Sequence, residues 1–124
     1  MTLSAILEAI VAGDAAILGV ALMDGDGIAV AELVGAGAGR LFPDGDLSAA
    51  AVEFGRAGGE LEKAASATRA GAVAETIVVM EAYSLLFARV QPGMTLVLAL
   101  EPDGNLGKAR YLIRGHLLGL REAL

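Results

Sequence analysis

The fold is decided by residues 76–100, TIVVMEAYSLLFARVQPGMTLVLAL, which hold three runs of strand-forming residues separated by two short turns. The runs are rich in β-branched and other apolar side chains and cover residues 76–80, 83–90 and 94–100. The second and third runs are apolar at both parities, so both faces of their sheet must be covered by helices. The stretch therefore predicts a layered α+β domain.

Both segments between these runs are short or contain residues that favour turns. Glu81-Ala82 is short enough for a hairpin, and Gln91-Pro92-Gly93 supplies a proline with a preset φ and a permissive glycine. A third hairpin is expected upstream, where Asp24-Gly25-Asp26-Gly27 separates the apolar runs 16–23 and 28–33, because an Asp-Gly pair between such runs is a strong hairpin signal. These segments give five strands.

Three helices complete the pattern. Apolar residues recur at helical spacing in the first, namely Leu3, Ile6, Leu7, Ile10 and Val11, and in the last, namely Leu106, Ala109, Ile113, Leu117, Leu120 and Leu124. Asn105 or Asp103 is suited to cap the last helix. The expected order is α-β-β-α-β-β-β-α.

The middle helix is expected over residues 47–69, with Gly71 just past its end and acids at 44 and 46 suited to its N-terminus. Its apolar or small positions alternate by three and four, as in a helix–helix seam: Leu47, Ala50, Phe54, Ala57, Leu61 and Ala64. Gly55, Gly58 and Gly59 each cost about 1 kcal/mol relative to alanine. Two interpretations stay open: the helix is kinked or interrupted there, or Gly55 and Gly59 let a second helix come close.

Composition narrows the class of protein. The 124 residues predict a single domain over 1–124, and no apolar stretch approaches the roughly 20 residues that a membrane helix needs. The N-terminus lacks a basic segment, and Glu8 interrupts what a signal peptide would keep apolar. With no cysteine and a net charge of −6, we expect a cytoplasmic protein that neither inserts into a membrane nor binds nucleic acid.

Few residues suggest chemistry. Asp24, Asp26 and Glu32 are spaced as in a calcium loop, but Ile28 and Ala29 stand where that loop needs an oxygen ligand and a glycine. His116, the only histidine, has no acid three or four residues away and no serine partner. We expect no catalytic residue, no metal and no cofactor. The alternative is a small ligand-binding domain or enzyme that uses the glycine-rich loop of Gly35, Gly37 and Gly39, although this loop lacks a P-loop ending.

Three features together resemble the Roadblock/LC7 family: the Asp26-Gly27-Ile28 hairpin tip, the alanine-rich middle helix and residues 103–110, DGNLGKAR. Within it the chain is similar to the stand-alone bacterial MglB/MglC-like group, closest to its MglC-like branch. The resemblance implies a profilin-like fold, with a five-stranded antiparallel sheet and helices on both faces. It also implies a regulator, not an enzyme, of a small Ras-like GTPase that controls cell polarity or motility.

The resemblance implies a homodimer in which the third strands of two chains pair and the second helices lie side by side. Residues 77–79 support this expectation, because a flat, uncharged strand is an aggregation hazard as a free edge. The expected dimer residues are Ile77, Val78, Val79, Leu47, Phe54 and Leu61, the last three shared between the core of each chain and the dimer.

Two partner surfaces are implied. Arg56, Glu60 and Lys63 would lie on the paired helices that contact the GTPase, and Asp24, Asp26 and Ile28 at the first hairpin. An exposed isoleucine beside an acid suits an interface anchor, the alternative being that Ile28 begins a strand and is buried. The partner is therefore expected to be the GTPase or, slightly favoured, another Roadblock protein that activates it.

Overall fold

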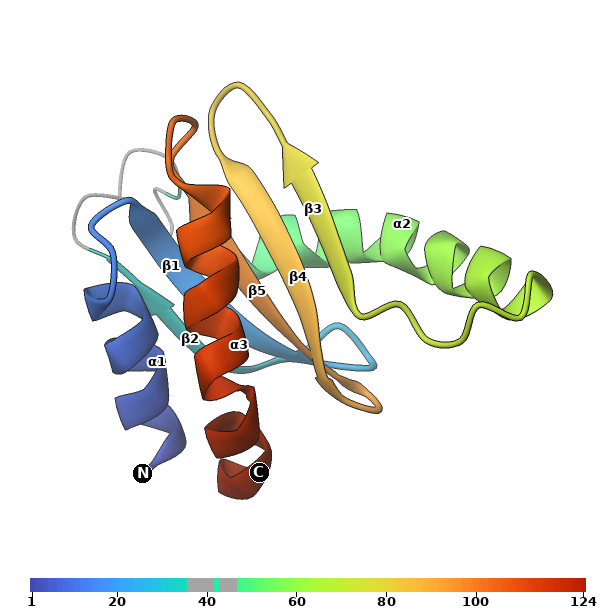
Figure 1. Ribbon diagram of the computed structural model, residues 1–124, viewed down its shortest axis with the longest axis horizontal. Coiled ribbons are helices and arrows are strands. Elements are labelled where there is room, and N and C mark those ends of the chain that lie inside the picture. Colours follow the sequence, from blue (N-terminus) through green and yellow to red (C-terminus); the bar gives the residue numbers. More distant parts are fainter. Residues whose placement is uncertain (36–41, 43–46) are drawn as a thin grey trace.

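A five-stranded antiparallel sheet lies between two layers of helices (Figure 1). The computed structural model describes residues 1–35, 42 and 47–124. The elements are α1 (Leu3–Ala12), β1 (Ile17–Asp24), β2 (Ala29–Val34), α2 (Leu47–Ala67), β3 (Glu75–Val79), β4 (Ser84–Gln91), β5 (Met94–Leu100) and α3 (Leu106–Ala123). The strand order is β2-β1-β5-β4-β3, so the predicted element order and the predicted fold class are both confirmed.

The bounds of four strands differ by one residue from those predicted, and β5 has its predicted bounds. The largest effect is at the β3–β4 turn, where Val79 pairs with Ser84 and the connection is therefore longer than the expected two residues. Tyr83 leaves the strand and its ring packs against Phe42, with centroids 5.1 Å apart. Tyr83 thus contributes an aromatic contact in the turn and is not part of the strand ladder.

The central strands β1, β4 and β5 have buried side chains on both faces, as the apolar runs predicted. On one face, α1 and α3 cover a core that includes Ile6, Ile10, Val20, Leu98 and Ile113. On the other face, a smaller core gathers under the first turns of α2 and contains Leu18, Met23, Phe42, Leu47, Ala51, Leu85 and Val97. Because β1 and β5 contribute to both cores, the central strands hold the two layers together.

The termini of α1 and α3 are capped by their own neighbours. The Thr2 hydroxyl accepts a hydrogen bond from the Ala5 amide at 3.2 Å, and the Asn105 side chain accepts one from the Lys108 amide at 3.0 Å. Of the two predicted caps for the last helix, Asn105 is therefore the one used. Within the described residues, no helix is both long and apolar enough to cross a membrane.

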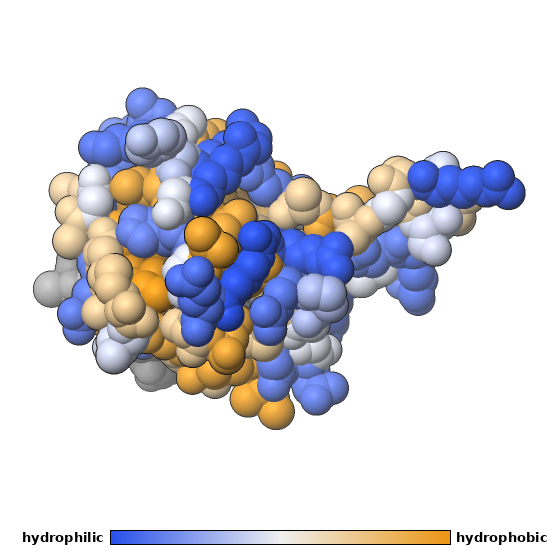
Figure 2. All heavy atoms as spheres, turned by 60° about the horizontal axis from the view of Figure 1, so that its bottom comes forward, coloured by the Kyte–Doolittle hydropathy of each residue, from blue (hydrophilic) through white to orange (hydrophobic). Residues whose placement is uncertain are grey.

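Helix α2 runs unbroken from Leu47 to Ala67, so of the two interpretations left open at its glycines an interrupted helix is excluded. It ends two residues before the predicted Arg69, which adopts a φ of 58°. The Ala70 amide then reaches back to the Ala65 carbonyl at 2.8 Å, the closing bond of a Schellman end. Only Leu47 and Ala51 of α2 are buried, and Val52 and Phe54 pack against the same core. The helix then crosses behind the sheet, and its C-terminal part projects beyond the sheet edge; we call the helix beyond Phe54 the arm (Figures 1 and 2).

The start of α2 is tied to the sheet by a contact that the sequence did not suggest. A carboxylate oxygen of Glu32, on β2, accepts a hydrogen bond from the Leu47 amide at 2.9 Å. An acidic side chain at a helix N-terminus satisfies a free amide and interacts favourably with the helix dipole. The cap therefore comes from a residue fifteen positions upstream. The acids predicted for this role, at 44 and 46, lie outside the described residues.

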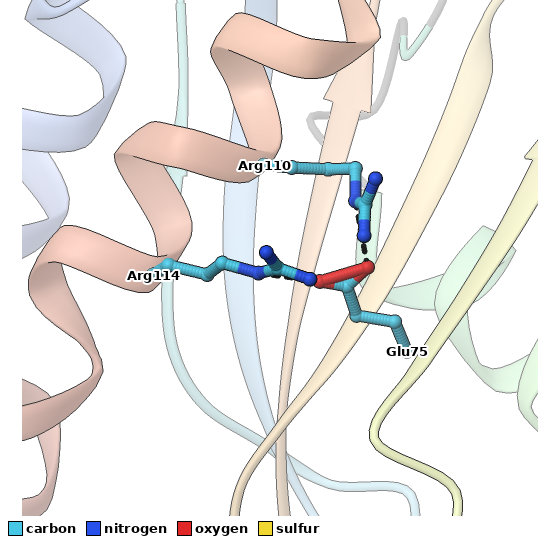
Figure 3. Close-up of polar contacts among 3 residues, drawn as sticks. All are labelled: Glu75, Arg110 and Arg114. Atoms are coloured by element: carbon cyan, nitrogen blue, oxygen red, sulfur yellow. Dashed lines mark hydrogen bonds and ion pairs between the residues drawn. The ribbon is translucent and has the colours of Figure 1, made fainter.

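At the far edge, Glu75 holds β3 against α3 (Figure 3). Its two carboxylate oxygens accept hydrogen bonds from Arg110 Nε at 2.8 Å and Arg114 Nε at 3.3 Å. The Glu75 side chain is only 22% exposed, so these charge-assisted bonds are partly shielded from solvent. We call this arrangement the Glu75 clamp.

Replacing Glu75 by glutamine should lower the free energy of unfolding by about 1–2 kcal/mol, because the negative charge is lost and one of the two accepting oxygens becomes an NH2 group that cannot accept from an arginine. The matched control is Glu60→Gln, which removes a surface pair whose side chains are 75% and 77% exposed. The control should change stability by less than about 0.5 kcal/mol. Urea unfolding of both variants checks this, and equal losses would mean that the clamp adds nothing beyond an ordinary surface pair.

Candidate partner-binding surfaces

The hairpin between β1 and β2 is built by Asp24. Its Oδ1 accepts hydrogen bonds from the amides of Asp26 at 2.9 Å and Ile28 at 3.0 Å, while Gly27 adopts a φ of 78°. Asp24 thus has a structural role in the turn. Asp26 is exposed at the tip, and Ile28 is 61% exposed, which rules out the alternative that it is buried at the start of the strand.

Val30 extends this apolar tip, and sequence analysis did not identify it. The pairing of β1 with β2 passes from Leu22–Ala31 to Met23–Ala29, so Val30 is the extra residue of a β-bulge. Its side chain is 49% exposed. Residues 29–32 alternate regularly, with Ala29 and Ala31 partly buried and Val30 and Glu32 exposed, so Val30 has the same parity as an exposed acid. The hairpin surface, defined as Asp26, Ile28 and Val30, therefore lies on an edge strand that the bulge makes irregular.

The candidate chemical sites gain no support from the described residues. No group of three or more histidine or acidic residues is placed to hold a metal ion in the described part of the chain, and Asp24 Oδ1 already accepts two amides of the turn. His116 Nδ1 lies 2.7 Å from the Leu112 carbonyl within its own helix. Gly37 and Gly39 of the glycine-rich loop lie outside the described residues.

The predicted charged residues of α2 lie on its exposed arm. Arg56 pairs with Glu53 at 3.3 Å and Lys63 with Glu60 at 3.2 Å, each within one turn. All four side chains are at least two-thirds exposed, and such pairs contribute little to stability. The charges are therefore free to exchange these partners for groups on another molecule.

A groove of about 880 Å³ separates the arm from the sheet. Its apolar lining comes from α2 and from strands β1, β3, β4 and β5, and includes Met23, Val52, Phe54, Leu61, Val78, Phe87 and Val97. Phe54 is partly buried there and Leu61 is 46% exposed. An apolar hollow open to solvent on this scale is typical of a surface that another element covers.

Leu47 does not line this groove. It is completely buried beneath the first turn of α2, in contact with the core of its own chain. The expectation that Leu47 is shared with a second chain is therefore corrected, because the side chain has no surface left to offer. Of the apolar stripe predicted along α2, the first turn is therefore buried in its own chain, and only the arm is open to a second chain.

Strand β3 forms one edge of the sheet and pairs only with β4 in the described part of the chain. Its side chains alternate, with Val78 lining the groove and Ile77 and Val79 on the opposite face. Val79 is 63% exposed and Ile77 37%. The edge predicted at residues 77–79 is thus present, apolar and adjacent to the groove.

Comparison with known proteins identifies structures that share this architecture. No family model and no curated protein matches the chain. Among solved structures, MglC from Myxococcus xanthus is 33% identical over the whole of both chains, with a TM-score of 0.69. A Roadblock/LC7 domain from Streptomyces avermitilis is 14% identical with a TM-score of 0.78, covering 98% of this chain and 97% of that one.

Myxococcus xanthus MglB is 17% identical with a TM-score of 0.79, over 95% of this chain and 84% of that one. These two lower identities indicate a shared fold alone. The full-length match to MglC at 33% identity also shows membership of the same family. The resemblance predicted from the hairpin tip, the alanine-rich helix and residues 103–110 is thereby confirmed. The chain belongs to the Roadblock/LC7 family, in its MglC-like branch.

Proposed function

We propose that this protein is a non-catalytic, cytoplasmic, homodimeric adaptor in a system that controls a small Ras-like GTPase in polarity or motility. It consists of a single domain and acts through protein surfaces. The observation that carries the proposal is the adjacency of the free β3 edge and the apolar groove under α2, in a chain 33% identical to MglC. One related structure is described as a gliding protein, MglB from Thermus thermophilus, at 20% identity.

The dimer joins the β3 edges of two chains into a continuous sheet and brings the two α2 arms together. Pairing satisfies the unpaired backbone groups of β3 and removes an exposed apolar edge. The same approach covers Phe54 and Leu61 in the groove. Backbone pairing and apolar burial thus act at one continuous surface, as expected of a stable association.

Two surfaces remain for other partners. The paired arms present Arg56, Glu60 and Lys63 to the GTPase, and the hairpin surface presents Asp26 with Ile28 and Val30 to a second Roadblock protein that activates the GTPase. The second route is slightly favoured, since the hairpin combines exposed apolar anchors with an orienting charge. Asp24 contributes by shaping the turn.

Val78→Lys should weaken self-association at least about tenfold, because each chain would place a lysine at an apolar seam. Val30→Lys is the matched control: it makes the same change on the opposite edge strand and should leave the dimer intact. Sedimentation equilibrium measures both dissociation constants. A Val78→Lys protein as dimeric as its parent would eliminate β3 as the seam.

The glycines of α2 allow a second test. Alanine at Gly55 and Gly59 meets no atom within 4 Å in the single chain, so the double variant should stabilise the helix by about 1 kcal/mol per site. If the arms approach closely at these positions, the added methyl groups should raise the dimer dissociation constant while helix content increases. Circular dichroism and sedimentation measure the two effects. A more helical protein with unchanged association would argue against close approach of the arms.

The proposed partners are tested by affinity capture from the source organism's lysate, followed by mass spectrometry. The wild-type protein is expected to retain a Ras-like GTPase or a second Roadblock protein, and Asp26→Lys/Ile28→Asp should lose the latter. Asp103→Lys, an exposed charge change before α3, is the control and should retain it. Retention of neither class by the wild-type protein would contradict the proposed function.

A further inference from the structure

The outer face of α3 carries an apolar ridge that no described part of the chain covers. Tyr111 is 77% exposed and Leu118 65%, among the most exposed large apolar side chains of the described chain. In an ideal helix these two residues lie about 20° apart around the axis and about 10 Å apart along it. Gly115 lies between them on the same side, and no atom lies within 4 Å of where its Cβ would be. The ridge is therefore two anchors separated by a notch.

Basic residues flank the ridge on both sides. From the helical positions, Arg110, Arg114 and Arg121 form one flank and Lys108 lies on the other. Helix α3 thus holds four of the nine basic residues of the chain and a single acid, Glu122, although the net charge of the chain is −6. Positive charge is concentrated on this one helix, and the remainder of the chain is correspondingly more acidic.

The three arginines are held in place by hydrogen bonds from Nε, and their other N–H groups remain as donors. Arg110 and Arg114 each use Nε on Glu75, and Arg121 Nε donates to the Val90 carbonyl. A guanidinium has five N–H donors, so each keeps several for another acceptor. The side chains of Arg110 and Arg114 remain 40% and 62% exposed. Figure 3 shows both extending from α3 toward β3, where Glu75 fixes their direction.

We propose that this α3 surface, defined as Lys108, Tyr111, Arg114, Gly115, Leu118 and Arg121, binds an acidic amphipathic helix of a partner protein. An apolar side chain of that helix enters the notch at Gly115, between Tyr111 and Leu118, and its carboxylates meet the basic flanks. Tyrosine and arginine are enriched among the residues that dominate binding energy at interfaces. The surface lies across the sheet from the α2 groove, so it is separate from the surfaces proposed above (Figure 1).

A protein helix fits these features better than an anionic membrane does. Only two large apolar side chains are offered, whereas membrane-surface helices bury a whole apolar face, and the apolar face of α3 is already occupied by the core, through Ala109, Ile113 and Leu120. The acidic remainder of the chain would also be repelled by anionic headgroups.

The test is titration of ¹⁵N-labelled protein with a synthetic 15-residue helical peptide that has leucines on one face and glutamates on its flanks. A control peptide has lysine in place of every glutamate. We expect amide shifts confined to α3 and its immediate contacts, binding that weakens with added salt, and at least about tenfold weaker binding of the lysine peptide. Shifts elsewhere, no binding, or equal binding of the two peptides would overturn the proposal.

Variants separate the ridge from general charge attraction. Tyr111→Ser/Leu118→Ser should weaken the glutamate peptide at least about tenfold, and Lys108→Glu about three- to fivefold. These side chains are exposed, so the thermal midpoint should not fall and loss of binding cannot be ascribed to unfolding. Lys63→Glu makes the same charge change on α2 and should bind normally.

An equal loss with Lys63→Glu would overturn the proposal. So would ridge-dependent binding to phosphatidylserine vesicles in the absence of binding to the peptide. Because the probe is synthetic and the readout lies on α3, this test is independent of whether the GTPase system is the right one.

Discussion

The structure depends on burying both faces of the same three strands. Strands β1, β5 and β4 contribute almost only apolar side chains, so neither face can be left to solvent. Helices α1 and α3 cover one face fully, whereas α2 covers the other only with its first turns. The remaining part of that face is the groove, and the asymmetry of the two layers therefore determines where a second molecule is needed.

The fold was largely predictable because its signals are local. Alternation, turn residues and helical stripes together gave the element order, and the Asp24 turn and the Asn105 cap act over four residues or fewer. What the sequence could not indicate depends on distant contacts. Glu32 caps α2 across fifteen residues, and Glu75 meets Arg110 across thirty-five. The bulge at Val30, where the pairing passes from Leu22–Ala31 to Met23–Ala29, is likewise a matter of pairing between strands.

The candidate surfaces were predictable in part for the same reason. The exposure of Asp26 and Ile28 follows from a turn that is visible in the sequence. The predicted dimer seam along α2 included one residue too many, Leu47. A stripe of apolar residues does not distinguish the first turn, which packs on its own sheet, from the arm, which does not. Leu47 and Leu61 occupy equivalent places in the pattern, yet one is fully buried and the other is 46% exposed.

The projection of α2 has a consequence for the secondary structure itself. Beyond Ala51 the helix has no buried side chain, and its arm contains three glycines. Short helices without tertiary packing are marginal in water, so in an isolated chain the arm should open locally far more often than the sheet does. Its amides should then exchange with solvent quickly, and its backbone should be open to proteases. Association that covers the arm would slow both the amide exchange and the proteolysis. Because association increases with protein concentration, the helix content of this protein should also increase with its concentration.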